Sequence, residues 1–334
     1  MSNNLMLQTI KKSIERVIIN EKGENLAKFG LLSDVLIRGE EVDIVIEFPE
    51  NLSIDQQNIQ EQIIKILKND GFANVKVIFS SKREERPIKQ KQKIPNIKKV
   101  LLMASAKGGV GKSTTAVNIA IALASQGFSV GIVDADIYGP TIPKLLGINQ
   151  KPDAEDGKML PIKKNNIYSI SIGYIVDESQ AAIWRGPMVS KALYQLLLGV
   201  KWPALDYLII DMPPGTGDIY LSLADNFVID GVVLISTPQN IALTMVKKSI
   251  SFFKKTNIPI IGLVENMSYY LDINNIRHNI FGENLTEKFA KEMTCELLGN
   301  VPLLPKISEF SDKGMSLLKE KEFQIYQEIA KRLR

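Results

Sequence analysis

The sequence contains very few cysteine and histidine residues, the side chains that form disulfides and many metal centres. Its 334 residues include one cysteine, Cys295, and one histidine, His278. A single cysteine excludes an intramolecular disulfide and is typical of a reducing compartment. The sequence also lacks a run of about 20 apolar residues that could span a membrane. Residues 1–5 lack the basic start and apolar core of a signal peptide. We therefore expect a cytoplasmic protein without a membrane span.

The charged residues are unevenly spread along the chain. The formal net charge is +4, yet the stretch from Lys82 to Lys99 alone contains eight basic and two acidic residues. Pro87, Pro95 and the lack of apolar periodicity are typical of a solvated linker, which we place at residues 81–98. A basic stretch can also contact nucleic acid, but charge runs are usually just solvated, so we do not expect a nucleic-acid partner.

The linker divides the chain into two predicted domains. Residues 1–80 predict a small α+β accessory domain, because helical and strand-like periodicities alternate within it. The helical stretches are 7–19 and 59–67, and the strand-like runs are 30–37, 42–48 and 75–79.

Residues 99–334 predict an α/β fold. Their strand-like runs are short and almost wholly apolar, at 130–134, 207–211, 231–236, 260–264 and 297–301. Strands of this kind are buried on both faces. Because helical stretches separate them, we predict a mostly parallel, doubly wound sheet with helices on both sides.

One short segment carries the strongest functional signal. Lys107-Gly-Gly-Val-Gly-Lys-Ser-Thr114 lies between an apolar run at 100–104 and an apolar helical stretch at 116–124. This is the strand–loop–helix context of a phosphate-binding loop (P-loop). Its glycines let backbone N–H groups approach phosphate oxygens, and the helix points its positive end at the same anion. Lys112 adds a charge near the outer phosphates, and Ser113 offers a hydroxyl to Mg²⁺. The predicted nucleotide contacts here are Ala106, Lys107, Gly108, Gly109, Val110, Gly111, Lys112, Ser113 and Thr114.

Acidic side chains follow two of the other predicted strands. Asp134 and Asp136 end one strand, and Asp211 ends another, at the carboxyl edge where ligands bind in such sheets. A carboxylate there can hold Mg²⁺, so we predict that Asp211 is a metal ligand together with Ser113. Asp136 is placed to orient or activate the attacking water. Asp134 is expected to support Asp136 or the metal site. A lone Asp could also merely cap a helix, but three motifs in this order favour a nucleotide site.

Five strings of residues recur as a set in one known family. They are the segment 107–115, Asp134-Ala-Asp-Ile-Tyr-Gly-Pro-Thr141, Trp184-Arg-Gly-Pro-Met188, Asp211-Met-Pro-Pro-Gly-Thr-Gly-Asp218 and Glu265-Asn-Met-Ser268. Together they resemble the Mrp/ApbC-type P-loop ATPases, the family of iron–sulfur cluster carrier proteins. The resemblance covers residues 99 to about 320 strongly and the front domain more weakly.

The resemblance implies slow, Mg²⁺-dependent ATP hydrolysis by a homodimer that assembles iron–sulfur clusters or transfers them to apoproteins. A lysine at position 107 marks the subgroup in which this residue reaches the phosphates of the partner subunit. The implied catalytic residues are Lys107, Lys112 and Asp136. By the same resemblance Asn266 contacts the adenine ring, and segment 301–306 closes the base pocket. The implied partners are a scaffold protein or an apoprotein client.

The family's cluster ligands are missing from this sequence. Members carry a Cys-x-x-Cys just after the Asn-Met-Ser motif, but this chain has no cysteine between Ser268 and Ile280. A cluster normally needs four thiolates, and a dimer would hold two. His278 and Asp272 lie in this segment, but a carboxylate oxygen suits a cluster badly. Cys295 is expected to be a small buried apolar residue. The sequence therefore predicts that no stable cluster is held by this chain alone.

A second class shares the Lys107-type loop. These are the Par/Min-type positioning ATPases, which act on DNA or membranes. A membrane-binding member needs a basic amphipathic tail, and residues 323–334 have apolar positions with basic residues at the end. Because no spacer separates this stretch from the rest of the fold, we expect it to be the closing helix packed on the sheet.

Overall fold

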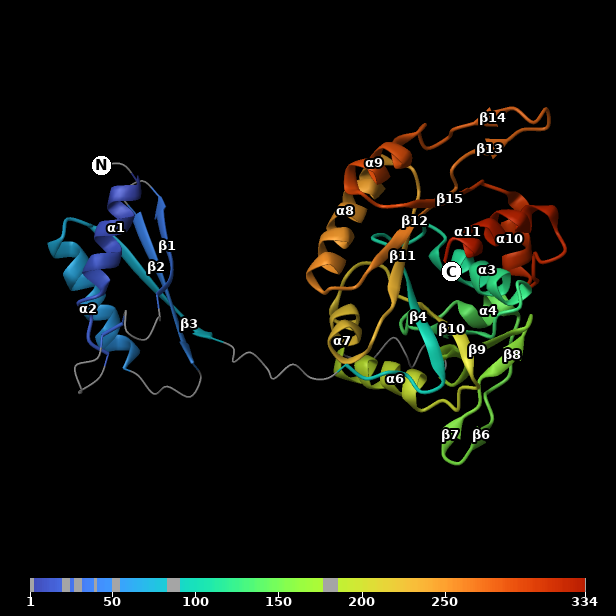
Figure 1. Ribbon diagram of the computed structural model, residues 1–334, viewed down its shortest axis with the longest axis horizontal. Helices are drawn as coiled ribbons and strands as arrows, with labels where there is room; N and C mark the ends of the chain where they lie inside the picture. Colours follow the sequence, from blue (N-terminus) through green and yellow to red (C-terminus); the bar gives the residue numbers. More distant parts are fainter. Residues whose placement is uncertain are drawn as a thin grey trace. The chain divides into compact units, whose positions relative to one another are not determined.

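The computed structural model describes residues 3–19, 25–26, 32–38, 41–49, 55–82, 91–176 and 186–333. The chain forms two compact units, residues 1–89 and 90–334 (Figure 1). Each unit has its own hydrophobic core. Within the described ranges, no helix is long and apolar enough to cross a membrane.

The first unit is a three-stranded sheet with two helices. Its elements in chain order are α1 (Asn3–Ile14), β1 (Leu32–Arg38), β2 (Glu41–Pro49), α2 (Gln56–Asn69) and β3 (Asn74–Lys82). The sheet order is β1-β2-β3, with β1 antiparallel and β3 parallel to β2. Alternate residues of β2 and one face of α2 are buried together, including Ile44, Ile46, Ile59 and Ile63. The predicted α+β fold of this small domain is therefore confirmed.

The second unit is built on an eight-stranded sheet of order β15-β12-β11-β4-β10-β5-β9-β8. The strands are β4 (Ile97–Ala104), β5 (Val130–Asp134), β8 (Ile162–Lys164), β9 (Ile167–Ser171), β10 (Leu205–Asp211), β11 (Gly231–Ser236), β12 (Ile260–Asn266) and β15 (Leu297–Val301). Every neighbouring pair is parallel except β8 and β9. The mostly parallel sheet expected from the apolar runs is therefore confirmed. The hairpin that adds β8 at the edge was not predicted.

Helices cover both faces of this sheet (Figure 1). The helices of this unit are α3 (Lys112–Ser125), α4 (Ile142–Leu146), α6 (Gly186–Leu198), α7 (Asp218–Asn226), α8 (Asn240–Lys255), α9 (Leu285–Met293), α10 (Pro305–Asp312) and α11 (Gln324–Lys331). Two small hairpins, β6 (Ala154–Glu155) with β7 (Lys158–Met159) and β13 (Tyr270–Leu271) with β14 (Arg277–His278), stand outside the main sheet. The shortest helical turns are η1 (Ile172–Tyr174) and η2 (Lys321–Phe323).

The second unit begins earlier than residue 99. Ile94 is buried, the Gln92 N–H donates to the carbonyl of Asn226, and β4 starts at Ile97. These contacts place the last part of the predicted linker 81–98 in the body of this unit. Periodicity alone missed it because only one apolar side chain anchors the segment before the strand. Residues 83–90 lie outside the described residues.

The end of the chain packs inside the second unit. Tyr326, Ile329 and Ala330 of α11 are buried, and the helix contacts α3 and β15. Phe323, just before α11, is also buried. The expectation that residues 323–334 form the closing helix is thus confirmed, and the apolar side of this helix faces the core.

Candidate nucleotide site

The carboxyl ends of the three central strands bring the predicted site residues together. In the parallel register, Asp211 at the end of β10 lies beside Asp134 of β5 on one side and Met103 of β4 on the other. The P-loop begins directly after β4. Because the strands are parallel, all three motifs meet at one edge of the sheet, as their order in the sequence predicted.

At two positions of the P-loop the backbone conformation favours glycine. Gly109 and Gly111 both have φ of 79°, a left-handed conformation that disfavours side chains. At Gly111 an added Cβ would also lie 2.1 Å from Nδ2 of Asn266. That Nδ2 donates to the carbonyl of Val110 at 2.8 Å. Asn266 therefore closes against the loop itself, and the glycine makes room for it.

The loop lysine forms a buried ion pair. Lys112 Nζ lies 2.5 Å from Oδ1 of Asp211 and 3.2 Å from Oγ of Ser113. The Lys112 side chain is 7% exposed and that of Asp211 is 0% exposed. Burial of both groups makes the pair strongly interdependent, because removing either charge leaves the other without its partner in a medium of low polarity.

The oxygen atoms around this pair fit a magnesium ion. Asp211 Oδ2 is buried and has no hydrogen-bond partner within the described part of the chain. An orphaned carboxylate oxygen is costly unless something binds it. Mg²⁺ prefers such hard oxygen ligands, and the hydroxyl of Ser113 lies 3.2 Å from the Lys112 Nζ that also contacts Asp211. The two predicted metal ligands therefore carry oxygen atoms of the kind that Mg²⁺ binds.

The two acids after β5 have separate structural roles. Asp134 is fully buried, and its oxygens accept hydrogen bonds from the backbone N–H groups of Asp136 and Ile142 and from the hydroxyl of Ser171, at 3.0–3.3 Å. Burial, and then the charge of Asp211, raises the pKa of Asp134 to about 8. Asp134 thus fixes the backbone of the segment that carries Asp136.

Asp136 is only partly buried and lines the cavity described below. Burial raises the pKa of the Asp136 carboxyl above its ordinary value, with a smaller contribution from Asp211, while Lys112 opposes the shift. A raised pKa makes a carboxylate a better proton acceptor, so its environment suits the predicted role beside a water molecule.

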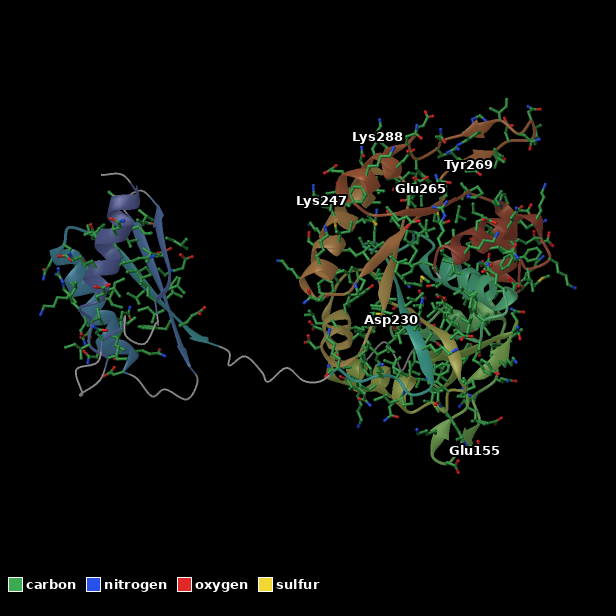
Figure 2. All side chains as sticks on the ribbon, in the orientation of Figure 1. Glu155, Asp230, Lys247, Glu265, Tyr269 and Lys288 are labelled. Carbon is green, nitrogen blue, oxygen red and sulfur yellow. The ribbon has the colours of Figure 1, made fainter. Side chains whose placement is uncertain are left out.

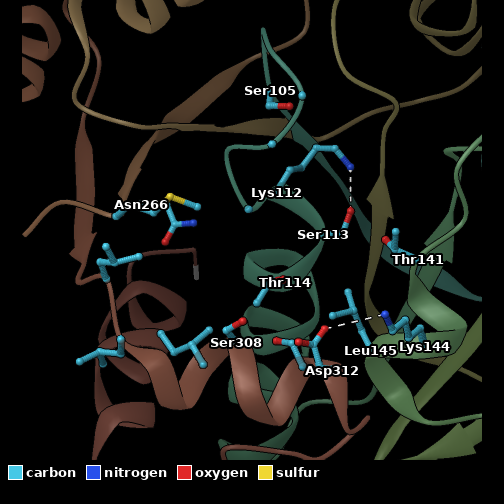
Figure 3. Close-up of a pocket in the computed structure, with 18 of the residues that line it drawn as sticks. Ser105, Lys112, Ser113, Thr114, Thr141, Lys144, Leu145, Asn266, Ser308 and Asp312 are labelled. Carbon is cyan, nitrogen blue, oxygen red and sulfur yellow. Dashed lines mark hydrogen bonds and ion pairs between the residues drawn. The ribbon is translucent and has the colours of Figure 1, made fainter. Parts of the chain in front are cut away.

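A cavity of about 510 Å³ opens at this edge of the sheet (Figure 3). Figure 3 shows Lys112 and Ser113 at one end and Ser308, Asp312 and Lys144 at the other. Eight predicted site residues line it: Gly108, Gly109, Gly111, Lys112, Ser113, Thr114, Asp136 and Asn266. Pro302, Leu303 and Leu304 add an apolar wall beside Asn266, which is where the resemblance placed the base pocket.

Three predicted nucleotide contacts do not line the cavity. Ala106 packs against the hydrophobic core, Val110 is buried, and Lys107 is exposed. Val110 takes part only through its carbonyl, which holds Asn266. The exposed position of Lys107 differs from that of Lys112 because Lys107 precedes the glycines, on the outer side of the loop.

The cavity also has lining residues that the sequence did not reveal. They come from α4 and its N-cap (Thr141, Lys144, Leu145) and from α10 (Ile307, Ser308, Ser311, Asp312). No local pattern marks them, because their proximity depends on two helices that lie far apart in the chain, at 142–146 and 305–312. Among the family strings, Trp184 and Arg185 lie outside the described residues.

The segment where the family has its paired cysteines forms the β13–β14 hairpin, which projects from the second unit (Figure 1). His278 on β14 contacts Asp272 at 3.0 Å, and the Arg277 guanidinium lies 4.2 Å from the ring centre of Tyr269, which Figure 2 marks. In the described ranges, no group of three or more His, Cys, Asp or Glu side chains could hold a metal ion.

Cys295 lies apart from this hairpin, just before β15. It packs against the core but is only partly buried, rather than the buried apolar residue that was expected, because it ends the α9 turn at the margin of the sheet. Burial and the charge of Glu296 raise the pKa of the thiol. A thiol with a raised pKa is a poor metal ligand, since the thiolate is the form that binds.

The fold and site define a P-loop nucleoside-triphosphatase-type protein. The chain belongs to the family of NUBPL iron-transfer P-loop NTPases, which matches residues 96–334. It is 41% identical over 303 residues to an iron–sulfur cluster carrier protein of Rickettsia felis, covering 90% of this chain and 92% of the relative. It is 48% identical over 253 residues to the iron–sulfur cluster carrier protein of Escherichia coli K12, covering 74% and 69%.

Solved structures agree with this fold. A nucleotide-binding protein from Archaeoglobus fulgidus in complex with ADP is 31% identical, with a TM-score of 0.60 and coverage of 69% of this chain and 92% of that protein. The cell division ATPase MinD of Pyrococcus furiosus has a TM-score of 0.55 at 22% identity, covering 71% and 98%. The second likeness concerns the fold alone.

Proposed function

We propose that this chain is an ATPase that serves the assembly of iron–sulfur clusters or their transfer to apoproteins. The observation that carries the proposal is the cavity at the sheet edge, where the P-loop, Asp136 and the apolar wall at 302–304 converge. Relatives at 41% and 48% identity bear the name iron–sulfur cluster carrier protein, and this name supports an iron–sulfur cluster as the cargo. The structure of the Archaeoglobus fulgidus protein in complex with ADP supports an adenine nucleotide as the ligand.

The residues of the chain suggest how ATP is bound and cleaved. The glycines and the N-terminus of α3 present N–H groups to the phosphates, and Lys112 leaves Asp211 to meet them. Ser113 and Asp211 would hold Mg²⁺, which neutralises the charge that develops on the transferred phosphoryl group. Asp136 orients the attacking water. Asn266 and the wall at 302–304 take the adenine ring. Hydrolysis by one subunit is slow, because Lys112 is the one P-loop lysine that it directs at its own phosphates.

Lys107 supplies a second lysine charge to the phosphates in a homodimer. Its side chain is exposed on the outer face of the loop and does not line the cavity of its own subunit. A lysine in this position can extend toward the phosphates of a second copy. Positive charge on the outer phosphate is a recurring requirement of phosphoryl transfer.

The cluster is cargo that this chain handles without ligating it alone. The β13–β14 hairpin carries no thiol, and Cys295 is a half-buried thiol with a raised pKa. Four thiolates are the usual ligand set. The proposal is therefore that ATP binding and hydrolysis drive a partnership with a thiol-bearing scaffold or client. For residues 1–80 we propose a structural or partner-docking role, and the cytoplasm is the proposed compartment.

The positioning ATPase is the weaker alternative. Its membrane version depended on a free amphipathic tail, but the apolar side of α11 is buried against α3 and β15. Co-sedimentation with DNA or anionic vesicles in the presence of ATP would nevertheless reveal such an activity, and the proposal requires that neither pellet contains the protein.

The direct test of the enzyme is phosphate release from ATP with Mg²⁺. Lys112→Ala and Asp136→Asn should each abolish most of the release, the first through lost phosphate binding and the second at the water step. Asp136→Asn should still bind ADP. Unchanged release by the Lys112→Ala protein would reject the assignment.

A further inference from the structure

Two helices that flank the cavity end in the same way. Gly147 closes α4 at φ of 59° and Gly314 follows α10 at φ of 62°. In each case the glycine N–H and the next N–H bond back into the last helical turn, to Lys144 and Pro143 in α4 and to Ser311 and Phe310 in α10. This is the Schellman arrangement, in which a left-handed glycine ends a helix.

The two helix ends touch backbone to backbone. A Cβ added to Gly314 would lie 2.4 Å from Cα of Gly147, 2.5 Å from its nitrogen and 2.9 Å from the carbonyl oxygen of Lys144. No side chain could therefore stand at position 314 without moving one helix away from the other. Lys164 Nζ donates to the carbonyl of Gly147 at 2.8 Å, and this stabilises the carbonyl end of α4 at the point of contact.

Each helix holds a different part of the nucleotide site. From α10, which directly follows the apolar wall at 302–304, Ile307, Ser308 and Asp312 line the cavity. α4 begins at Ile142, whose N–H donates to Asp134 at 3.0 Å, and the other oxygen of the same carboxylate holds the N–H of Asp136 at 3.3 Å. The position of Asp136 is thus tied to α4 through one fully buried group.

We propose that the contact between Gly147 and Gly314 is a positioning device for hydrolysis. It transmits the placement of α10, which the bound base sets, through α4 and Asp134 to the Asp136 carboxylate. Gly147 and Gly314 do not line the cavity and act only through these elements. The inference rests on the proposed ATPase function.

The ion pair that also joins the two helices contributes little. Lys144 Nζ lies 3.8 Å from Oδ1 of Asp312, and the two side chains are 74% and 71% exposed. An exposed pair of this length is worth at most a fraction of a kcal/mol. The close approach of the two backbones is what fixes the distance between α4 and α10.

The test compares two glycine substitutions in the full chain. Gly314→Ala introduces the clash, whereas Gly157→Ala is the matched control, because Gly157 has φ of 74° with open space around its Cβ position. At saturating ATP we expect kcat to fall about fivefold or more in Gly314→Ala, since displacements of about 1 Å in a reacting constellation are costly. Gly157→Ala should keep the wild-type kcat.

A second readout does not depend on turnover. In hydrogen exchange, ADP should protect the amides of 136–142 and of 108–114 in the wild type. Gly314→Ala should lose the protection of 136–142 and keep that of 108–114. If the chain binds ADP but has no ATPase activity, the proposed function is wrong. The exchange experiment with ADP still tests the contact between Gly147 and Gly314.

Three results would overturn the inference: an unchanged kcat with a raised KM alone, equal losses in both glycine variants, or retained protection of 136–142. If Gly314→Ala does not fold, the Lys164→Met variant tests the inference instead. It removes the donor to the Gly147 carbonyl and adds no atom between the two helix ends. For Lys164→Met we expect a kcat about two- to threefold lower than in the wild type and weaker protection of 136–142. Wild-type values for both would show that the contact does not position Asp136.

Discussion

Replacing Lys112 by methionine should destabilise the nucleotide-free protein strongly. The substitution keeps most of the side-chain volume but leaves the Asp211 carboxylate, which is 0% exposed, without its cation. Oδ2 of Asp211 already lacks a partner in the described structure, so no second hydrogen bond compensates. Removing one member of a buried pair costs about 3–5 kcal/mol, and we expect a loss in this range.

The matched control is Lys144→Met. This lysine is also paired with an aspartate, Asp312, but both side chains are exposed, so its loss should cost less than about 1 kcal/mol. Urea unfolding at neutral pH without nucleotide measures both values. The double variant Lys112→Met/Asp211→Asn should recover much of the loss, because it removes the unpaired charge. Equal costs for the two lysines, or no recovery in the double variant, would refute this reasoning.

Three further outcomes follow from the site. Gly111→Ala should lower the unfolding free energy by about 1–3 kcal/mol more than Gly109→Ala, since both share φ of 79° but only the first meets Asn266; equal losses in urea melts would contradict this. Asp134 has a pKa raised to about 8, so its contribution to stability is present at low pH and falls as pH rises through about 4 to 8. Asp134→Asn should flatten that slope, and an unaltered slope in melts across this range would count against it. Lys107→Ala should keep ADP affinity but lose phosphate release; in mixed dimers, full activity from a subunit's own Lys107 would disprove the trans role.

The sequence predicted the central features of the site because they are local. The P-loop is a continuous string whose chemistry needs no distant partner, and Asp211 could be placed because carboxyl ends of parallel strands meet at one edge. The direct pairing of Lys112 with Asp211 is not predicted by the sequence, since each motif indicates a contact with the ligand rather than with the other residue. Hydrogen bonds across the sheet edge depend on register, which the apolar pattern does not specify.

Features that depend on long-range packing were out of reach. Ser308 and Asp312 line the cavity only because α10 packs beside α4, and nothing in their neighbourhood marks a ligand contact. Strands β8 and β9 are short and polar on one side, so they lack the apolar runs that revealed the central strands. The sequence pattern does not reveal that the second unit begins within 91–98, because basic residues dominate this segment.

The measurement closest to the central claim is cluster transfer under anaerobic conditions. A thiol-bearing scaffold loaded with a [4Fe–4S] cluster is mixed with an apoenzyme whose activity reports cluster arrival, with wild-type chain or Lys112→Ala, with and without ATP and Mg²⁺. The account predicts faster transfer only with wild-type chain and ATP, and less than one iron per dimer on the chain after reconstitution and desalting. Transfer that ignores ATP, or a brown dimer that retains about four irons, would contradict it.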